Sequence, residues 1–485
     1  MSMRPSEAAD PVPSAEVSQE AAAGPVILTA SERAALTGLA GPVARRLEAA
    51  GVTVVALCFV DNAGVTRVKA APLGRFERAA GWGIGMSPVF DVFGVDDSIT
   101  TSPHIGGPGG DLRLIPALDR ATPLAAQPGW AFAPVDRYTQ DGRAYAGCQR
   151  SFARAQVARA AEQGFTARMS FEIEWAVGHD EDGRFVPACD GPGYGMTRII
   201  ELSDYSREVI EAIEAQGIVV EQFHPEYAAG QLEISIAPND PVGAADDSVL
   251  VRQTIRAVSQ RHGLLASFAP SVVAGGVGNG GHVHLSLWRD GSNLLTGGDG
   301  RYGLTKEGEA FAGGVHDLLP ALTAIGSPSV ASYLRLVPSH WAGVYQCWGR
   351  ENREAALRLV TGSSGERDIR ANLEVKCFDL AANPYLVVGS VLAAGLSGIA
   401  AGATLPAEIV GDPAGLTDAE LSARGVVRLP TSLPESTAAL AASDVLAEAM
   451  GEPLFEAFLA VRRAEADLFA GVSPEQVVAA TRWRW

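Results

Sequence analysis

Strict alternation of polar and apolar residues is the feature that most constrains how this chain folds. Within residues 278–288, His282, His284 and Ser286 share one parity, and the residues between them are apolar. Period two is the signature of a β-strand with one polar and one apolar face. The glycine-rich run before it, which includes Gly278, permits a sharp turn and leaves room for a ligand. The segment predicts either two solvated histidines on a hairpin strand or a metal or phosphate site.

Three further segments show the same period with charged side chains, at residues 169–177, 230–237 and 371–378. Each segment places its charged residues on one face of the expected strand. One more carboxylate precedes the second segment, in the sequence Phe-His-Pro-Glu. The acidic residues concerned are Glu172, Glu174, Glu226, Glu233 and Glu374, with Lys376 on the same face as the last of them.

A single glutamate in a strand usually lies on the solvated face, but the joint pattern is harder to explain that way. Carboxylates that converge repel one another unless a cation lies among them. A site rich in oxygen ligands with an occasional imidazole suits Mg²⁺ or Mn²⁺ better than zinc. The strands together therefore predict a divalent-metal site.

Arginines follow the histidine strand in the chain, and they suggest what the metal acts on. Arg335, Arg353 and Arg358 offer planar donors that suit phosphate and carboxylate groups, although surface ion pairs are the ordinary role of such residues. Arginines and divalent metals beside a glycine-rich loop indicate phosphoryl transfer from a nucleotide. The sequence carries neither the P-loop motif nor the protein-kinase motifs.

Composition excludes several classes of function. The 485 residues allow more than one domain, and the net charge of −18 argues against nucleic acid and anionic membrane surfaces as partners. The 5 cysteines form no C-x-x-C pair, which is typical of reduced thiols in the cytoplasm. An uninterrupted apolar run of about 18 residues is absent, so we expect no membrane span.

The order of segments predicts an α+β fold in two domains. Residues 1–28 are rich in Ala, Ser, Pro and Glu and are expected to form a disordered tail. A small domain over 29–145 would contain a helix capped by Ser31, a hairpin turning at 61–64 and an extended segment at 89–95. A helix at 148–163 would open the large domain, residues 146–485.

Six motifs in order resemble the glutamine synthetase family over about residues 50–485. They are Glu-Ile-Glu, His-Pro-Glu with Gly-Gln-Leu-Glu, Gly-Gly-His-Val-His-Leu-Ser-Leu, Ser-Tyr-Leu-Arg-Leu-Val-Pro, Asn-Arg-Glu-Ala-Ala-Leu-Arg and Ala-Ala-Asn-Pro-Tyr-Leu. The resemblance implies a small N-terminal β-grasp domain and a large C-terminal catalytic domain with a curved antiparallel sheet flanked by helices. It also implies a homo-oligomer, usually a dodecamer of two stacked rings, with sites formed between neighbouring subunits.

The resemblance also implies the ligands of two or three Mg²⁺ or Mn²⁺ ions in each site. Carried over to this sequence, one metal is held by Glu174, Glu226 and Glu233. The second metal, which contacts the ATP phosphates, is held by Glu172, His282 and Glu374.

The remaining roles implied by the resemblance concern ATP and glutamate. The residues assigned to the nucleotide are His284, Ser286 and Arg358, those assigned to glutamate are Arg335 and Gly278, and those assigned to catalysis are Arg353, Arg358 and Lys376. In the implied reaction, the γ-carboxylate of glutamate attacks the γ-phosphate of ATP to give an acyl phosphate. An amine then displaces phosphate to form an amide.

The sequence also departs from the family pattern at the amine site. Three residues after the proline of Arg-Leu-Val-Pro, glutamine synthetases carry a glutamate that closes the ammonium site, whereas this chain has Trp341. An indole cannot balance NH₄⁺ by charge, but it can pack against an organic amine. The aspartate that deprotonates ammonium has no matching motif, which leaves Asp91, Asp96 and Asp97 open as the base.

Two further departures lie elsewhere. The final Glu-x-Arg of the family is Glu374-Val-Lys376, so the charge is kept without the bidentate geometry of arginine. The tyrosine of the adenylylation loop has no counterpart around residues 404–412, so we expect no control of that kind.

These departures predict an ATP-dependent glutamate–amine ligase that makes γ-glutamylamines, and the scattered cysteines predict a cytoplasmic location. The amine would be an organic monoamine such as ethanolamine, or a polyamine. The missing carboxylate at Trp341 favours the monoamine, because a dication would find no anion there. Two alternatives are an ammonia-dependent glutamine synthetase and a non-catalytic sensor of glutamate or nucleotide. The complete set of metal-ligand matches argues against the sensor.

Overall fold

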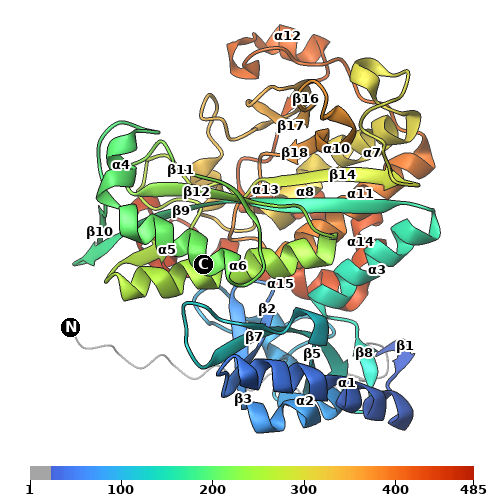
Figure 1. Cartoon of the computed structure of the whole chain (residues 1–485). Helices are drawn as coiled ribbons and strands as arrows, with labels where there is room; N and C mark the ends of the chain where they lie inside the picture. The colour runs from blue at the N-terminus through green and yellow to red at the C-terminus, as the bar shows by residue number, and fades with distance from the viewer. Residues whose placement is uncertain (1–22) are drawn as a thin grey trace.

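The computed structural model describes residues 23–485, with side chains from residue 28 on. Two sheets organise the chain, a smaller one near its beginning and a larger one after it (Figure 1). Of the predicted tail, residues 1–22 lie outside the described residues. Residues 23–27 form strand β1, so regular structure begins earlier than predicted. The prediction missed this because β1 is stabilised by a distant partner: it pairs with β8 (Arg143–Tyr145).

The first sheet has eight strands and is mixed. Its main order is β1-β8-β7-β2-β3, and the β2–β7 pair is parallel. Strands β5 and β6 also pair with β7, and β4 pairs with β5. Its remaining strands are β2 (Val54–Val60), β3 (Thr66–Pro72), β4 (Ile84–Met86), β5 (Leu112–Pro116), β6 (Thr122–Pro123) and β7 (Trp130–Thr139). Helices α1 (Ala30–Ala49) and α2 (Phe76–Trp82) pack against each other and cover this sheet (Figure 1).

Two details of this region differ from the prediction. The cap of α1 is Thr29 and not Ser31, because Thr29 and Glu32 bond each other's backbone N–H groups in a capping box. The segment expected to be extended at 89–95 begins with a 3₁₀ helix over Pro88–Val92. Proline at the first helical position and a bond from the Val89 N–H to the Ser87 hydroxyl favour that turn.

The second sheet has eleven strands. Eight of them follow the main order β11-β12-β9-β14-β18-β17-β16-β19, while β10 and β13 pair with β9 and β15 pairs with β14. Its neighbours are antiparallel except for β16 and β17, which run parallel. The strands are β9 (Thr166–Glu181), β10 (Arg184–Pro187), β11 (Val220–Pro225), β12 (Gln231–Ile236), β13 (Leu265–Ser267), β14 (Val283–Arg289), β15 (Ser292–Asn293), β16 (Tyr345–Arg350), β17 (Ala355–Val360), β18 (Asn372–Val375) and β19 (Val427–Arg428).

Helices flank this sheet, and the predicted helix at 148–163 is α3 (Gln149–Glu162). The others are α4 (Met196–Glu201), α5 (Ser203–Glu214), α6 (Pro241–Arg261), α7 (Lys306–Asp317), α8 (Leu319–Gly326), α9 (Ser332–Arg335), α10 (Arg367–Arg370), α11 (Pro384–Ala401), α12 (Asp418–Ala423), α13 (Leu433–Ala441), α14 (Asp444–Met450), α15 (Glu452–Leu468) and α16 (Pro474–Thr481). The predicted α+β class is confirmed.

One helix, α11, is long and apolar enough to cross a membrane by length and composition, with a mean hydropathy of 1.7. However, 78% of it is buried, against α3, α6 and α7 among others. Such burial is typical of a core helix. We therefore interpret α11 as the centre of the larger core.

The alternation predicted for the long strand β9 is confirmed. Phe171, Ile173 and Trp175 are buried in the core, and the Trp175 indole N–H donates to the hydroxyl of Tyr205 on α5. Since successive side chains point to opposite faces, Glu172 and Glu174 lie on the other face of the sheet. This polar face carries the candidate active site.

Candidate active site

Strand register alone brings a first row of polar residues together. His224 on β11 lies opposite Glu233 on β12, and Glu233 lies opposite Glu174 on β9. The nearest nitrogen–oxygen distances are 3.0 Å from His224 Nε2 to Glu226 Oε1 and 3.7 Å to Glu233 Oε1. His224, Glu226 and Glu233 can each offer one ligand atom to a common ion. The predicted first metal set shares two of these residues.

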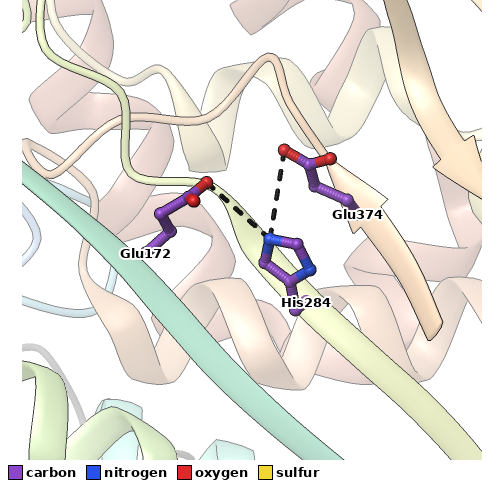
Figure 2. A group of neighbouring side chains, drawn as sticks. All are labelled: Glu172, His284 and Glu374. Carbon is purple, nitrogen blue, oxygen red and sulfur yellow. Dashed lines mark ion pairs between the residues drawn. The ribbon is translucent and has the colours of Figure 1, made fainter. Parts of the chain in front are cut away.

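A second row crosses the neighbouring strands. His284 on β14 lies opposite Glu374 on β18, which lies opposite Arg358 on β17. Figure 2 shows the His284 ring between Glu172 and Glu374, with Nε2 at 3.7 Å and 3.9 Å from their carboxylate oxygens. These three residues form the second group that can hold a metal ion.

His282 lies just before β14 and is also close to this group. Its Nδ1 is 2.7 Å from Glu172 and 3.4 Å from Glu374, and its carbonyl accepts a bond from the Glu172 N–H. Both histidines therefore face the same two carboxylates. The resemblance assigned His282 to the metal and His284 to the nucleotide, and those separate roles stay predictions.

The electrostatics of the cluster fit a divalent cation. Burial and the neighbouring carboxylates, chiefly that of Glu172, raise the pKa of Glu233 to about 12. Burial also raises the pKa of Glu174. At Glu374, burial alone would raise the pKa, but the positive charges of Lys376 and His284 have the larger effect and lower the pKa to about 2. Oxygen ligands that repel one another in this way are the donor set that Mg²⁺ or Mn²⁺ would stabilise.

The glycine-rich segment packs directly on the cluster. A Cβ atom on Gly280 would lie 2.5 Å from His282 Nε2 and 2.7 Å from the Glu174 carboxylate, and one on Gly278 would lie 2.8 Å from Arg335 Cγ. The backbone N–H of Gly280 donates to Glu174 at 2.8 Å. The glycines are therefore needed because the loop touches the site residues themselves.

The basic residues lie at different distances from this cluster. Arg335 is buried and donates to His282 Nε2 at 3.1 Å, while Arg358 donates to Glu374 at 2.9 Å. Lys376 is buried, with Nζ 3.0 Å from Glu374 Oε1. Arg353 is exposed and forms no ion pair with the residues whose side chains are described. Arg335, Arg358 and Lys376 thus join the cluster, whereas no hydrogen bond or ion pair of the described side chains links Arg353 to it.

A cleft of about 230 Å³ opens beside the second row. It is lined by Glu172, His284 and Ser286, together with Arg168 and Asn372. His284 is oriented there by Asn372, whose side-chain oxygen lies 2.9 Å from Nδ1. The hydroxyl of Ser286 accepts a bond from the Trp288 indole. The predicted nucleotide residues His284 and Ser286 therefore share one cleft.

Of the three aspartates left open as the amine base, one is excluded by its surroundings. Asp91 is 0% exposed, and its carboxylate accepts bonds from Arg137 at 2.9 Å and from Tyr145 at 3.0 Å. A group so enclosed cannot reach a substrate. Asp96 and Asp97 are exposed, and Asp97 pairs with Arg67 at 2.7 Å.

Sequence reasoning missed two residues at the first row. His224 stands in the quoted Phe-His-Pro-Glu motif but was given no role, although its period-two relation to Glu226 was visible. Tyr194 stacks on the His224 ring, 5.7 Å between centroids, and donates to Glu226 at 2.8 Å. The position of Tyr194 has no sequence signal, because it comes from a loop more than 25 residues away from its partners.

The profile of the glutamine synthetase catalytic domain matches residues 146–478. The chain belongs to the glutamine synthetase family. It is therefore an ATP-dependent ligase acting on glutamate and an amine, and members of the family use ATP and divalent metals. The resemblance inferred from the six motifs is confirmed.

Individual relatives agree with this assignment. The gamma-glutamylpolyamine synthetase GlnA3 of Streptomyces coelicolor is 58% identical over 438 residues, which cover 90% of this chain and 94% of the relative. A solved structure described as a novel glutamine synthase homolog has a TM-score of 0.80 at 32% identity, covering 90% of this chain and 99% of its own. A GmaS/ADP complex has a TM-score of 0.78 at 28% identity, covering 89% and 97%.

Proposed function

We propose that this member of the glutamine synthetase family joins a polyamine, and not ammonia, to the γ-carboxylate of glutamate. The observation that carries the choice against ammonia is Trp341, which stands at the sequence position of the family's ammonium-site glutamate in a chain that keeps the carboxylates and histidines of the cluster. The choice of a polyamine is supported by the 58% identity to a gamma-glutamylpolyamine synthetase. The relative thus favours the polyamine over the small monoamine expected from Trp341 alone.

The two groups of ligands would hold at least two divalent cations. Glu174, Glu226 and Glu233 are the candidates for one site, with His224 beside them, and Glu172, Glu374 and a histidine of β14 are the candidates for the other. When bound, such cations neutralise charge on the ATP phosphates. The raised pKa of Glu233, which burial and its carboxylate neighbours cause, supports this assignment.

In the first step, the γ-carboxylate oxygen of glutamate forms a bond to the γ-phosphorus of ATP, and the bond to ADP breaks. Arg335 would bind the glutamate, since it is buried beside Gly278 and the cluster. His284 and Ser286 would bind the nucleotide in their shared cleft. Arg353, Arg358 and Lys376 would stabilise the charge of the transferred phosphoryl group.

In the second step, the neutral amine nitrogen attacks the acyl carbon, phosphate leaves, and the nitrogen loses a proton. Asp96 and Asp97 remain the candidates for the base, because both are exposed. In the resembling family, the corresponding loop is expected to contribute to a neighbouring subunit's site, which supports an oligomeric assembly here. We therefore propose a ring-forming homo-oligomer, a dodecamer of two rings, in which this loop completes the site of the next copy.

We also propose a domain division near residue 145 and a cytoplasmic location. The division is supported by the two separate sheets and by the start of the family match at residue 146. The location is supported by the five cysteines, which are unpaired and buried.

The test is turnover of the purified chain with glutamate, ATP and Mg²⁺ and one amine at a time. Phosphate release and the mass of the product are measured with putrescine, spermidine, ethanolamine and ammonium. The proposal predicts γ-glutamyl-putrescine or γ-glutamyl-spermidine as the main products. Turnover with ammonium alone would replace it by an ordinary glutamine synthetase, and ATP binding without turnover of any amine would favour a sensor.

A further inference from the structure

A buried carboxylate without an assigned role lies directly behind the amine-site tryptophan. Glu354 precedes β17 and is only 8% exposed. Its Oε1 accepts the backbone N–H of Trp341 at 2.9 Å, and its own N–H is held by Asn352 Oδ1 at 3.0 Å. The position that lacks the family's glutamate is therefore bonded to a glutamate from the turn that precedes β17.

The loop that carries Trp341 is held tightly against this carboxylate. Ser339, Trp341 and Gly343 all have positive φ, at 60°, 55° and 63°. A Cβ on Gly343 would lie 2.9 Å from Ala356 Cα and 3.0 Å from Lys376 Cβ, so the loop packs on the start of β17. The arrangement fixes the backbone of Trp341 while its side chain stays 55% exposed.

The charge of Glu354 has no cationic partner among the residues whose side chains are described. Burial raises the pKa of Glu354, against the lowering effect of the Trp341 N–H and of the charges on Lys376 and His340. The Nζ of Lys376 is itself bonded to Glu374 at 3.0 Å. The Oε2 atom accepts no hydrogen bond from the described residues and is not enclosed by them. Asp412, which bonds Ser339 of the same loop, adds further negative charge. A cation from the substrate would relieve this imbalance.

We propose that Glu354 binds the second, non-reacting ammonium group of the substrate, and that Trp341 packs against the carbon chain between the two nitrogens. This inference rests on the proposed function and names its substrate class: diamines and longer polyamines. It resolves the conflict between Trp341 and a dication, since the anion missing at position 341 lies one hydrogen bond away. The reacting nitrogen must be neutral, whereas the distal one keeps its charge and can pair with Glu354.

The test compares putrescine with n-butylamine, which has the same four-carbon chain and lacks only the distal ammonium. The ratio of their kcat/KM values is measured in the wild-type enzyme and in Glu354→Gln, which keeps an oxygen acceptor for the Trp341 N–H but loses the charge. A charge-assisted hydrogen bond predicts that the ratio falls by about tenfold or more, chiefly through a higher KM for putrescine. Glu448→Gln, an exposed change on α14, serves as the matched control and should keep the wild-type ratio.

A purely structural role gives a different result. If Glu354 only caps the Trp341 loop, Glu354→Gln keeps the wild-type ratio, while Glu354→Ala lowers the rate with both amines alike and lowers the melting temperature. That outcome overturns the inference and leaves the proposed function intact. By contrast, a wild-type enzyme that uses neither organic amine overturns the proposed function itself.

Discussion

Glu233 on β12 and Glu174 on β9 are cross-strand partners in the middle of the larger sheet. Like charges directly opposite each other destabilise a sheet unless one is neutral or a cation lies between them. The pair therefore favours a protonated Glu233 when no metal is bound, and a divalent cation between the two carboxylates would stabilise it further. This relationship leads to the first two predictions.

Replacing Glu233 by Gln should weaken Mg²⁺ binding and reduce turnover while leaving the fold intact. The loss should exceed about tenfold, the effect typical even of groups that only support a metal ligand. Mg²⁺ titration of turnover and direct binding of Mn²⁺ measure it, and Glu448→Gln serves as the control. Near-normal turnover of Glu233→Gln at limiting Mg²⁺ would show that the assignment of the site is wrong.

The metal-free enzyme should lose stability as pH rises. The pKa of Glu233 is raised from 4.5 to about 12, so the folded chain keeps a proton that the unfolded chain releases. The unfolded state then binds fewer protons above pH 4.5, and the free energy of unfolding falls with increasing pH. His284, whose pKa is raised to about 9 by Glu172 and Glu374 against the effect of burial, acts in the same direction above pH 6.5.

The contribution of Glu233 is isolated by comparison with Glu233→Gln in the presence of EDTA. Between about pH 5.5 and about pH 8.5, the melting temperature of the wild type should fall more steeply than that of the variant. Excess Mg²⁺ should remove much of the difference, because the ion binds only the folded wild-type site well. Parallel curves in EDTA would contradict the raised pKa.

Much of this site could be predicted because strands fix side-chain parity. Glu172 and Glu174 lie on one face of β9 for that reason alone. His282, just before β14, and His284 on β14 both face Glu172, as the alternation predicts. The role of Glu354 could not be predicted, since its bond to Trp341 depends on a loop with positive φ that no periodicity reveals. The parallel pairing of β16 and β17 likewise depends on contacts beyond the local pattern.

Replacing Arg353 by Ala should lower kcat by roughly 10²-fold and change the KM for ATP much less. The exposed guanidinium forms no ion pair among the described side chains and is free to contact the nucleotide, so we expect that contact to strengthen as phosphoryl charge develops. Steady-state kinetics in ATP measure the effect, with Arg45→Ala on α1 as the control. An increase in KM with unchanged kcat would assign Arg353 to ground-state binding instead.

Trp341 should determine the preference for organic amines over ammonia. At pH 7 only about one aliphatic amine molecule in a thousand is neutral, and an aromatic wall favours that form by excluding water. Trp341→Glu should lower kcat/KM for the preferred organic amine and raise the relative use of ammonia. Trp341→Ala should widen the range of amines without creating ammonia use. If Trp341→Glu leaves the ranking unchanged, the tryptophan does not line the amine site.

The central claim, that the enzyme prefers polyamines to ammonia, is tested most directly by a competition between amines in a single reaction mixture. The enzyme receives glutamate, Mg²⁺, limiting ATP and equal concentrations of spermidine, putrescine, ethanolamine and ammonium, and the γ-glutamyl products are quantified by mass spectrometry. The account predicts that most of the ATP is consumed in forming γ-glutamyl-polyamines and that glutamine is a minor product. Glutamine as the main product would contradict it.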